Sequence, residues 1–573
     1  MPIYMPLRSN EIRLFYLEPW RKAPNDPIHL SLFVSRLDCQ PRYEALSYVW
    51  GDSSRPLPIT INGENLEVGR SLHEALIELR AEAPLRRTLW VDAICINQRD
   101  ATEKSQQVAR MTEIYQKAFS TIMWIGKQES LAADLRNIEE LHEALLHDSQ
   151  EMEGWSLSLG GQVTRSMDTF LSMPYFSRSW ITQEIVVSRN PVITFNTGKL
   201  CFDRIASTFR LAHTLQPGIS TRASEFVSLD NMRKAVRDIE KTQHATNKVN
   251  GKRLEDNGNP SHDESKGPNI LPDLISLLIS ERDKGATDAR DKVYALLGIN
   301  GLAGCCQFSP DYTITTNELY IAIASKLIQQ SNGLRILSSS QPRYSTRKLP
   351  SWVPDWSQPW RGGIDKRDNF SSGRSLDPRI CVNSENNSIS LYGARVDTVR
   401  RMVNARLMDW EYTDIIDPLA SILQRESEKL GVPRQWFCKN EPKSLLLQVL
   451  VAGRGQFVMS KDLNQFKGFS NTGEFEMNPY NIHKRRWDRF QHNLAWVENE
   501  WDMFETSNGY VGLAPTSILP GDVVWILGDG NVPFILRQRT QGGYELVGEC
   551  YLYGFVQDCV YINQLPTEKI VIW

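Results

Sequence analysis

The sequence predicts an α/β protein whose first half builds a mostly parallel sheet covered by helices on both faces. Short apolar runs typical of buried strands alternate with helical periodicity over about residues 40–200. Parallel neighbours need crossover connections, and helices of this length provide them. After this part we expect a mostly helical region and then a small C-terminal β-rich region.

The strand candidates of the first half are short and bounded by turn residues. Apolar, β-branched and aromatic residues dominate the runs 43–50, 88–93, 121–126 and 191–195. Between the first two runs, 59–61 and 66–68 flank Asn62-Gly63, the dipeptide that favours a two-residue hairpin turn. We therefore expect four buried strands and one added hairpin.

Helix signals separate these runs. Ser71 and Glu74 form a capping box ahead of an apolar stripe, and Asp100 is a candidate cap for the next helix. Further helical stripes cover 131–145 and 180–187. Each predicted helix lies between two predicted strands, as crossover connections require.

The remainder divides by composition. Residues 245–269 are almost free of apolar side chains, so we predict a flexible insert. Helices are expected at 271–282, 288–298 and 316–331, and closely spaced hairpins from residue 522 onward indicate a small sheet or partial barrel. The predicted organisation is an N-terminal extension (1–42), the α/β domain (43–200), a helical region (201–340), a loop-rich and helical region (341–510) and a β-rich region (511–573).

Composition excludes several classes of protein. The 573 residues are 41% apolar and 23% charged, the balance of a globular protein rather than of a disordered or collagen-like chain. Lys and Arg total 65 and Asp and Glu 68, a net charge of −3, which lacks the basic excess that drives nucleic-acid or anionic-membrane binding. We expect neither a nucleic acid nor a membrane as partner.

The sequence shows no signal for export or membrane insertion, so we expect the protein in the cytoplasm. No basic segment followed by an apolar stretch begins the sequence, and no run of about 18 apolar residues occurs. Nine cysteines at irregular spacing include no CxxC pair, so we expect reduced thiols rather than a disulfide framework. The protein is expected to be soluble and cytoplasmic.

Two motif classes are rejected on spacing. His142 and His147 are five residues apart, so on a helix they point about 140° apart and cannot share a metal ion. Neither GxxxxGK[ST] nor GxGxxG occurs, which leaves Walker-type hydrolysis and the standard dinucleotide fingerprint without support. We predict no metal and no cofactor.

Ligands of open α/β sheets bind beyond the carboxyl ends of the strands. This rule gathers 48–52, 92–98 and the start of the helix at 180 into one candidate cleft. Asp92 either faces the cleft or caps the following turn, and the sequence leaves both open. Cys95 is a conceivable nucleophile, but a small buried residue in a tight turn is the favoured interpretation.

Trp180 and Glu184 are four residues apart and share one helix face. An aromatic plane can stack on a heterocycle, and a carboxylate can bind ribose hydroxyls and stabilise the oxocarbenium-like transition state of glycosidic cleavage. The structural alternative is a core Trp180 with Glu184 held by an arginine such as Arg178. Spacing alone favours that alternative.

Three long motifs resemble the fungal heterokaryon-incompatibility (HET) domain over about residues 43–195. They are Tyr43 to Gly51 (YEALSYVWG), Leu89 to Gln98 (LWVDAICINQ) followed by Asp100, Glu103 and Tyr115, and Arg178-x-Trp180-x-x-Gln183-Glu184. The segments 288–298 and 349–356 also resemble parts of HET proteins. Two departures, Lys104 and Ala289, lie outside the candidate cleft.

HET domains are thought to be distantly similar to Toll/interleukin-receptor (TIR) domains, some of which cleave NAD with a helix-borne glutamate. The resemblance implies a TIR-like sheet, Glu184 as the catalytic residue and NAD as substrate. The substrate-binding residues that it implies are Tyr48, Trp50, Gly51, Asp52, Asp92, Asn97 and Trp180.

Two functional hypotheses follow. In the first, the protein is an NAD glycohydrolase of a non-self recognition system, and loss of NAD kills the cell. In the second, the HET domain is a non-enzymatic signalling module that oligomerises, with itself or with a protein partner, to trigger cell death, and Glu184 is structural.

Overall fold

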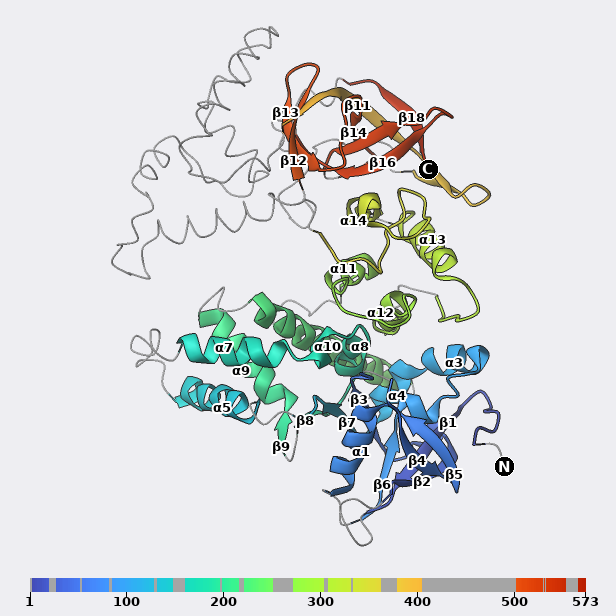
Figure 1. Cartoon of the computed structure of the whole chain (residues 1–573), viewed down its shortest axis with the longest axis vertical. Coiled ribbons are helices and arrows are strands. Elements are labelled where there is room, and N and C mark those ends of the chain that lie inside the picture. Colours follow the sequence, from blue (N-terminus) through green and yellow to red (C-terminus); the bar gives the residue numbers. More distant parts are fainter. Residues whose placement is uncertain are drawn as a thin grey trace. The chain divides into compact units, whose positions relative to one another are not determined.

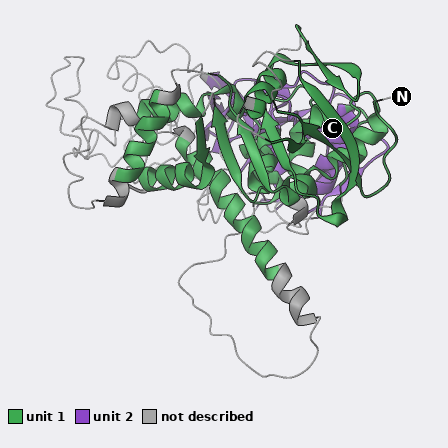
Figure 2. Ribbon diagram, turned by 90° about the horizontal axis from the view of Figure 1, so that it is seen from below, with its two compact units in different colours: residues 1–315 green, residues 316–573 purple. Residues whose placement is uncertain are grey.

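The computed structural model describes most of the chain in two compact units, residues 1–315 and 316–573 (Figure 2). The described residues are 3–19, 27–51, 54–81, 85–127, 131–147, 160–195, 198–215, 221–250, 272–302, 308–330, 333–361, 379–403, 501–528, 530, 532–552 and 565–573. None of the described helices is both long enough and apolar enough to cross a bilayer.

Unit 1 is built on a nine-stranded sheet with the order β5-β4-β2-β1-β6-β3-β7-β8-β9 (Figure 1). Its centre consists of four parallel strands, which confirms the predicted parallel sheet. These strands are β6 (Arg87–Trp90), β3 (Glu44–Tyr48), β7 (Ser120–Trp124) and β8 (Pro191–Phe195). All five residues of β7 are buried, as expected of a strand covered on both faces.

The order of the parallel strands defines a switch point. In chain order β3 is the first strand, β6 the second, β7 the third and β8 the fourth, so their spatial order is 2-1-3-4. Connections from β3 and from β7 therefore leave in opposite directions along the sheet. In doubly wound sheets of this order, the crevice beyond the carboxyl ends of the first and third strands is where ligands bind.

Helices connect the strands as the sequence predicted. They are α1 (Arg70–Ala81), α2 (Asp92–Cys95), α3 (Ala101–Val108), α4 (Met111–Lys117), α5 (Leu131–His147), α7 (Gly160–Leu171) and α8 (Trp180–Val186), with 3-10 turns η1 (Leu37–Cys39) and η2 (Pro174–Ser177). Asp100 caps α3 by accepting from Thr102 and Glu103, as predicted. Helix α1 starts at Arg70, one residue before the predicted Ser71.

The edges of the sheet hold five further strands. They are β1 (Glu11–Leu17), β2 (His29–Arg36), β4 (Leu57–Ile61), β5 (Glu64–Val68) and β9 (Gly198–Cys201). These strands pair antiparallel except where β2 and β4 run parallel to each other. Asn62 and Gly63 both have positive φ and join β4 to β5 in the predicted hairpin. Residues 1–42, expected as an extension, instead supply β1 and β2, and β1 pairs directly with β6.

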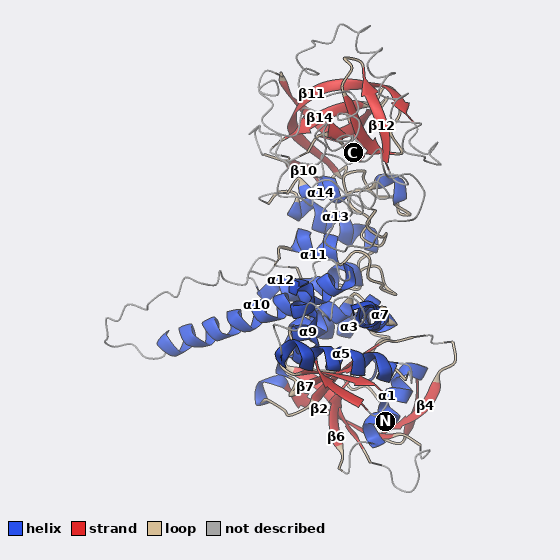
Figure 3. Cartoon of the chain, turned by 90° about the vertical axis from the view of Figure 1, so that its left-hand side faces the viewer, coloured by secondary structure: helices blue, strands red, loops and turns tan. Residues whose placement is uncertain are grey.

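Helices complete unit 1 (Figure 3). They are α9 (Phe202–Leu215), α10 (Thr221–Asn250), α11 (Leu274–Ser280) and α12 (Asp291–Leu302). A cluster of aromatic rings packs α7, α9 and α10 together, with Phe170 and Phe226 6.1 Å apart between ring centroids. The flexible insert was predicted to begin at residue 245, but 245–250 continue α10, because helix elongation tolerates polar residues. The rest of that insert, to residue 269, lies outside the described residues.

Unit 2 contains a closed ring of five strands. The ring runs β11-β14-β15-β16-β18 and returns to β11. These strands are β11 (Ser388–Val403), β14 (Val523–Leu527), β15 (Phe534–Gln538), β16 (Tyr544–Glu549) and β18 (Thr567–Ile572). The C-terminal β-rich region is thus confirmed, but β11 lies within 341–510, where loops and helices were expected.

Shorter elements flank this barrel. Strands β12 (Trp501–Thr506), β13 (Val511–Pro515) and β17 (Tyr551–Leu552) extend the sheet from the far end of β11, and β10 (Cys381–Asn383) pairs with its start. The remaining elements are α13 (Thr316–Leu327), α14 (Arg335–Ser339) and η3 (Pro342–Tyr344). Residues 404–500 lie outside the described residues, so the helices expected there are not tested.

Candidate functional site

The candidate site lies where β3 ends, at the switch point of the sheet. Ser47 and Tyr48 are the last two residues of β3, and Asp92 follows the end of β6. Helix α8, just before β8, brings Glu184 to this edge, because Ile181 and Ile185 on the same helix are fully buried in the core. The topology therefore joins residues from all three HET-like motifs.

Glu184 is buried in a network of hydroxyl groups. Its side chain is 1% exposed, and its Oε2 accepts a hydrogen bond from the Ser47 hydroxyl. The Ser47 Oγ also lies 2.6 Å from the hydroxyl of Tyr175, and the nearby Tyr115 hydroxyl donates to the carbonyl of Leu46 at 3.2 Å. Burial raises the pKa of Glu184, against the opposing effect of the Arg178 charge.

Arg178 lies between two carboxylates. Its Nη1 is 3.8 Å from Oε2 of Glu184 and donates to the carbonyl of Tyr48. Burial works against the charged guanidinium, but the carboxylates of Glu184 and Asp92 outweigh it and raise the pKa of Arg178. The contact expected under the structural alternative, an arginine holding Glu184, is therefore present.

Asp92 is the first residue of α2 and does not cap this helix, because the N-cap residue is Val91 and no side-chain cap hydrogen bond forms there. Its Oδ1 accepts from the backbone N–H of Ala93 at 2.7 Å, at the start of α2. Its Oδ2 accepts from Nε1 of Trp50 at 3.0 Å, and the Trp50 side chain is partly exposed to solvent. Burial raises the pKa of Asp92, although Arg178 and Trp50 oppose this shift.

Not every predicted site residue joins this cluster. Tyr48 takes part through its carbonyl and is itself buried, and Gly51 follows Trp50 with φ of +67°, a conformation that suits glycine. The indole of Trp180 hydrogen bonds Asp291 of α12 rather than the Ser47 network. Asp52 lies outside the described residues.

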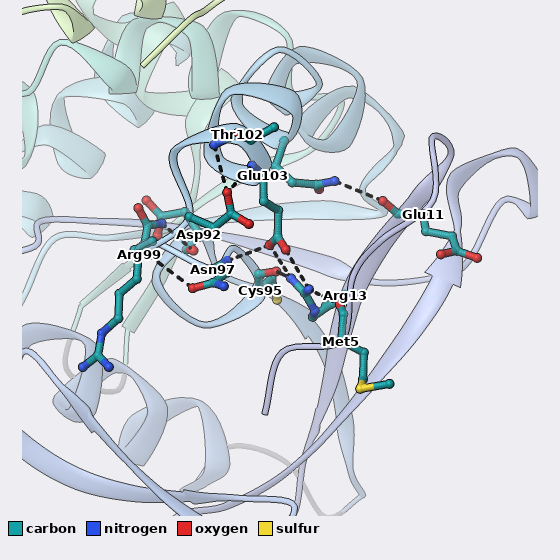
Figure 4. Close-up of polar contacts among 12 residues, drawn as sticks. Met5, Glu11, Arg13, Asp92, Cys95, Asn97, Arg99, Thr102 and Glu103 are labelled. Atoms are coloured by element: carbon teal, nitrogen blue, oxygen red, sulfur yellow. Dashed lines mark hydrogen bonds and ion pairs between the residues drawn. The ribbon is translucent and has the colours of Figure 1, made fainter. Parts of the chain in front are cut away.

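Asn97 belongs to a second polar network, centred on a buried ion pair (Figure 4). Arg13 of β1 contacts both carboxylate oxygens of Glu103, at 2.6 and 2.9 Å. The same glutamate accepts from the backbone N–H of Asn97 at 2.8 Å, and Arg13 donates to the carbonyl of Cys95 at 3.0 Å. This pair fixes the loop that follows Asp92.

The structure does not support Cys95 as a nucleophile. Cys95 is 1% exposed, and burial raises the pKa of its thiol to about 12, so it stays protonated at neutral pH. This agrees with its favoured interpretation as a packing residue. Among the residues that the structure describes, no three His, Cys, Asp or Glu side chains lie where they could hold a metal ion.

Sequence reasoning missed several residues of the cluster. Ser47 and Tyr115 lie inside the recognised motifs, but nothing in their spacing indicated a contact with Glu184. Tyr175 comes from outside those motifs, and Asp291 lies in the segment 288–298, for which the sequence indicated no contact with the site. Ser47 and Tyr115 could have been found by considering every hydroxyl-bearing residue within the HET-like motifs as a possible partner of Glu184.

Family models match two regions of the chain. Residues 43–184 match the family described as heterokaryon incompatibility protein (HET), and residues 475–562 match the Het-6 β-barrel domain. The first match agrees with the HET-like motifs of the sequence, and the second shows that the C-terminal part is similar to a Het-6 barrel, which those motifs did not indicate.

A curated relative extends the similarity to nearly the whole chain. Heterokaryon incompatibility protein 6, OR allele, of Neurospora crassa is 25% identical, and the alignment covers 96% of this chain and 94% of the relative. No solved structure matches the chain.

Proposed function

We propose that this protein acts in heterokaryon incompatibility, as an effector of non-self recognition that leads to cell death. The observation that carries this proposal is the joint match of the HET domain and the Het-6 barrel, in a chain that aligns over 96% of its length with a protein named for heterokaryon incompatibility. A match to the HET family alone would say nothing about the rest of the chain. Here a second match, to the Het-6 barrel, covers part of the C-terminal region as well.

For the mechanism we propose cleavage of NAD at the bond between nicotinamide and ribose. Water adds to the anomeric carbon, the carbon–nitrogen bond breaks, nicotinamide leaves with the bonding electrons and one proton is released. The supporting observation is a carboxylate, Glu184, beyond the end of β3 at the switch point, where doubly wound sheets bind ligands. The 2-1-3-4 order is also consistent with a TIR-like arrangement.

Each neighbour of Glu184 then has a chemical role. The ionised carboxylate of Glu184 stabilises positive charge on the ribose as nicotinamide departs. Trp50 offers a partly exposed ring on which a heterocycle can stack, and Asp92 orients that ring through the indole N–H. Trp180, which the resemblance implied as a substrate-binding residue, has no role in this proposal, because its side chain interacts with Asp291.

A second candidate is a non-enzymatic signalling module. The observation that favours it is the burial of Glu184, which is 1% exposed and already hydrogen bonded to Ser47. In this case the Ser47–Glu184–Arg178 network stabilises the end of the sheet, and cell death follows from oligomerisation with further copies or a protein partner.

Release of nicotinamide from NAD by the purified full-length chain separates these candidates. We expect turnover by the wild type and loss of at least 100-fold in Glu184→Gln, which keeps the shape but not the charge. Glu143→Gln is the matched control, because Glu143 is half-exposed on α5 and pairs with Arg204. The assay is run over a range of concentrations with the molar mass measured by light scattering.

The same variants expressed in fungal cells complete the test. An oligomeric wild type that leaves NAD intact, together with a Glu184→Gln variant that still kills cells, would exclude the hydrolase and favour the signalling module. Loss of cell death in Glu184→Gln with an intact fold and parallel loss of NAD turnover would favour the hydrolase.

A further inference from the structure

Of the four side chains described above beside Glu184 (Ser47, Tyr115, Tyr175 and Arg178), Arg178 is the one that reaches solvent. Ser47, Tyr115 and Tyr175 are each no more than 1% exposed, whereas the Arg178 side chain is 16% exposed. A small molecule that approaches Glu184 must therefore displace the Arg178 side chain, because the other three belong to the packed core. Arg178 is a flexible side chain, and its contact with Glu184 is an ion pair of 3.8 Å rather than a close hydrogen bond.

The backbone around Arg178 is held by a segment far away in sequence. Residues 281–285, which we call the strap, run beside residues 177–179 like a short parallel strand. The N–H of Ser179 donates to the carbonyl of Gly285 at 2.9 Å, and the N–H of Gly285 donates to the carbonyl of Ser177. The strap therefore fixes the position from which the Arg178 side chain extends.

Side chains reinforce this connection. Lys284 of the strap donates to the hydroxyl of Thr182 on α8 at 2.6 Å, and that hydroxyl donates to Glu281. Lys284 and Glu281 also form an ion pair at 2.6 Å. From behind, the buried Lys292 donates to the strap carbonyls of Arg282, at 2.8 Å, and Lys284.

The strap is the part of this arrangement best able to move. Its contacts with residues 177–182 that we have described are hydrogen bonds, which water can replace, and Asp283 and Gly285 are exposed. In contrast, α8 is fixed by fully buried side chains such as Ile181 and Ile185. Segments with few buried apolar contacts are the ones that open locally at the lowest cost in free energy.

We propose that Arg178 is a gate over Glu184 and that the strap holds this gate closed. The structure is then the closed form of the site, and release of the strap from residues 177–182 lets the guanidinium swing away and opens Glu184 to a ligand. The proposal rests on the proposed function only in naming Glu184 as the group that a substrate must reach. It also places the control of the HET site outside residues 43–184.

Labelling of carboxylates with a water-soluble carbodiimide and glycine ethyl ester, followed by mass spectrometry, tests the gate without any enzymatic assay. In the wild type we expect Glu184 to be labelled at least 10-fold more slowly than the half-exposed Glu143. In Arg178→Gln, and separately in Lys284→Met, we expect Glu184 to be labelled at least 5-fold faster than in the wild type. Glu143 serves as the internal control and should react equally in all three proteins.

Each outcome decides the proposal. Unchanged labelling of Glu184 in both variants overturns the gate, and so does wild-type labelling as fast as that of Glu143. If Arg178→Gln does not fold, Lys284→Met decides, because it removes only the polar contacts of a strap side chain that is 15% exposed and changes no apolar core residue. Faster labelling of Glu184 in the variants without any NAD turnover supports the gate and contradicts only the proposed hydrolase activity. Failure of the gate and failure of the proposed function can therefore be told apart.

Discussion

Arg13 and Glu103 form a buried two-point ion pair that ties the first strand of the sheet to helix α3 (Figure 4). The Arg13 side chain is 2% exposed and that of Glu103 10% exposed. Glu103 belongs to the second HET-like motif, whereas Arg13 lies before the region that the HET family model matches. The folded α/β unit therefore includes residues that precede the matched domain.

Arg13→Met should destabilise the protein strongly. The substitution keeps most of the volume but leaves the Glu103 carboxylate buried without its partner, which costs about 3–5 kcal/mol. Thermal unfolding monitored by circular dichroism measures the loss. Arg36→Met is the control, because Arg36 and Asp38 are an exposed pair whose removal should change the unfolding temperature little. Equal effects of the two substitutions would contradict the importance of the buried pair.

Gly298→Ala should disturb the packing of α12 on α8 and α4. A Cβ at this position would lie 1.9 Å from Oγ1 of Thr112 and 2.5 Å from Oε1 of Gln183, so side chains must shift. Overpacking of this kind costs about 1–3 kcal/mol, and thermal unfolding should show it. Thr112→Ala in the same chain removes the nearest atom and should recover part of the loss. At Gly285→Ala, the control, the nearest atom is 3.5 Å away and little change is expected.

The stability difference between the wild type and Glu184→Gln should depend on pH. Because burial raises the pKa of Glu184 above 4.5, the folded state binds more protons than the unfolded state at pH values above 4.5. The contribution of this carboxyl to the free energy of unfolding is fully present below its pKa in the unfolded state. It is lost as the pH rises through its pKa in the folded state. The advantage of the wild type over Glu184→Gln should therefore shrink from pH 5 to pH 7 in denaturant titrations. An advantage that grows over this range would show that the ion pair with Arg178 dominates instead.

Asp522→Ala should weaken the barrel of unit 2. Asp522 is 3% exposed in its side chain and accepts from Nε and Nη2 of Arg537, both at 2.8 Å, and from the N–H of Leu519. Removal of this carboxylate should cost about 1–3 kcal/mol, because the hydrogen bonds that it accepts are lost while Arg537, which is 36% exposed, stays solvated. Hydrogen exchange in β14 and β15 should become faster. Glu545→Gln, at a half-exposed carboxylate 3.6 Å from Arg539, is the control and should leave the exchange of these strands unchanged.

Local patterns predicted the central sheet well. The four parallel strands, the hairpin at Asn62-Gly63 and the cap at Asp100 each depend on residues that are near one another in sequence. The helix predicted to follow the Asp100 cap is interrupted at Ala109-Arg110, which separates α3 from α4. The gathering of Tyr48, Asp92 and Glu184 at one edge followed from the rule for parallel strands.

Contacts between distant segments could not be predicted from such patterns. Nothing in the segment 11–17 indicates that Arg13 pairs with Glu103, and nothing in 281–292 indicates that it packs on α8. The spacing of Trp180 and Glu184 placed both on one face, yet Trp180 pairs with Asp291 because α12 covers that end of α8. Two residues on the same helix face can contact different neighbouring elements, and only the tertiary structure shows which element each of them contacts.

The ring of strands in unit 2 also constrains the order of events during synthesis. Ile389 of β11 pairs with Ile572 of β18, so the ring cannot close before residue 572 has left the ribosome. The residues that form the α/β sheet are all translated hundreds of residues earlier and can reach their native partners first. A nascent chain therefore passes through a period in which its HET domain is assembled while its barrel is still open.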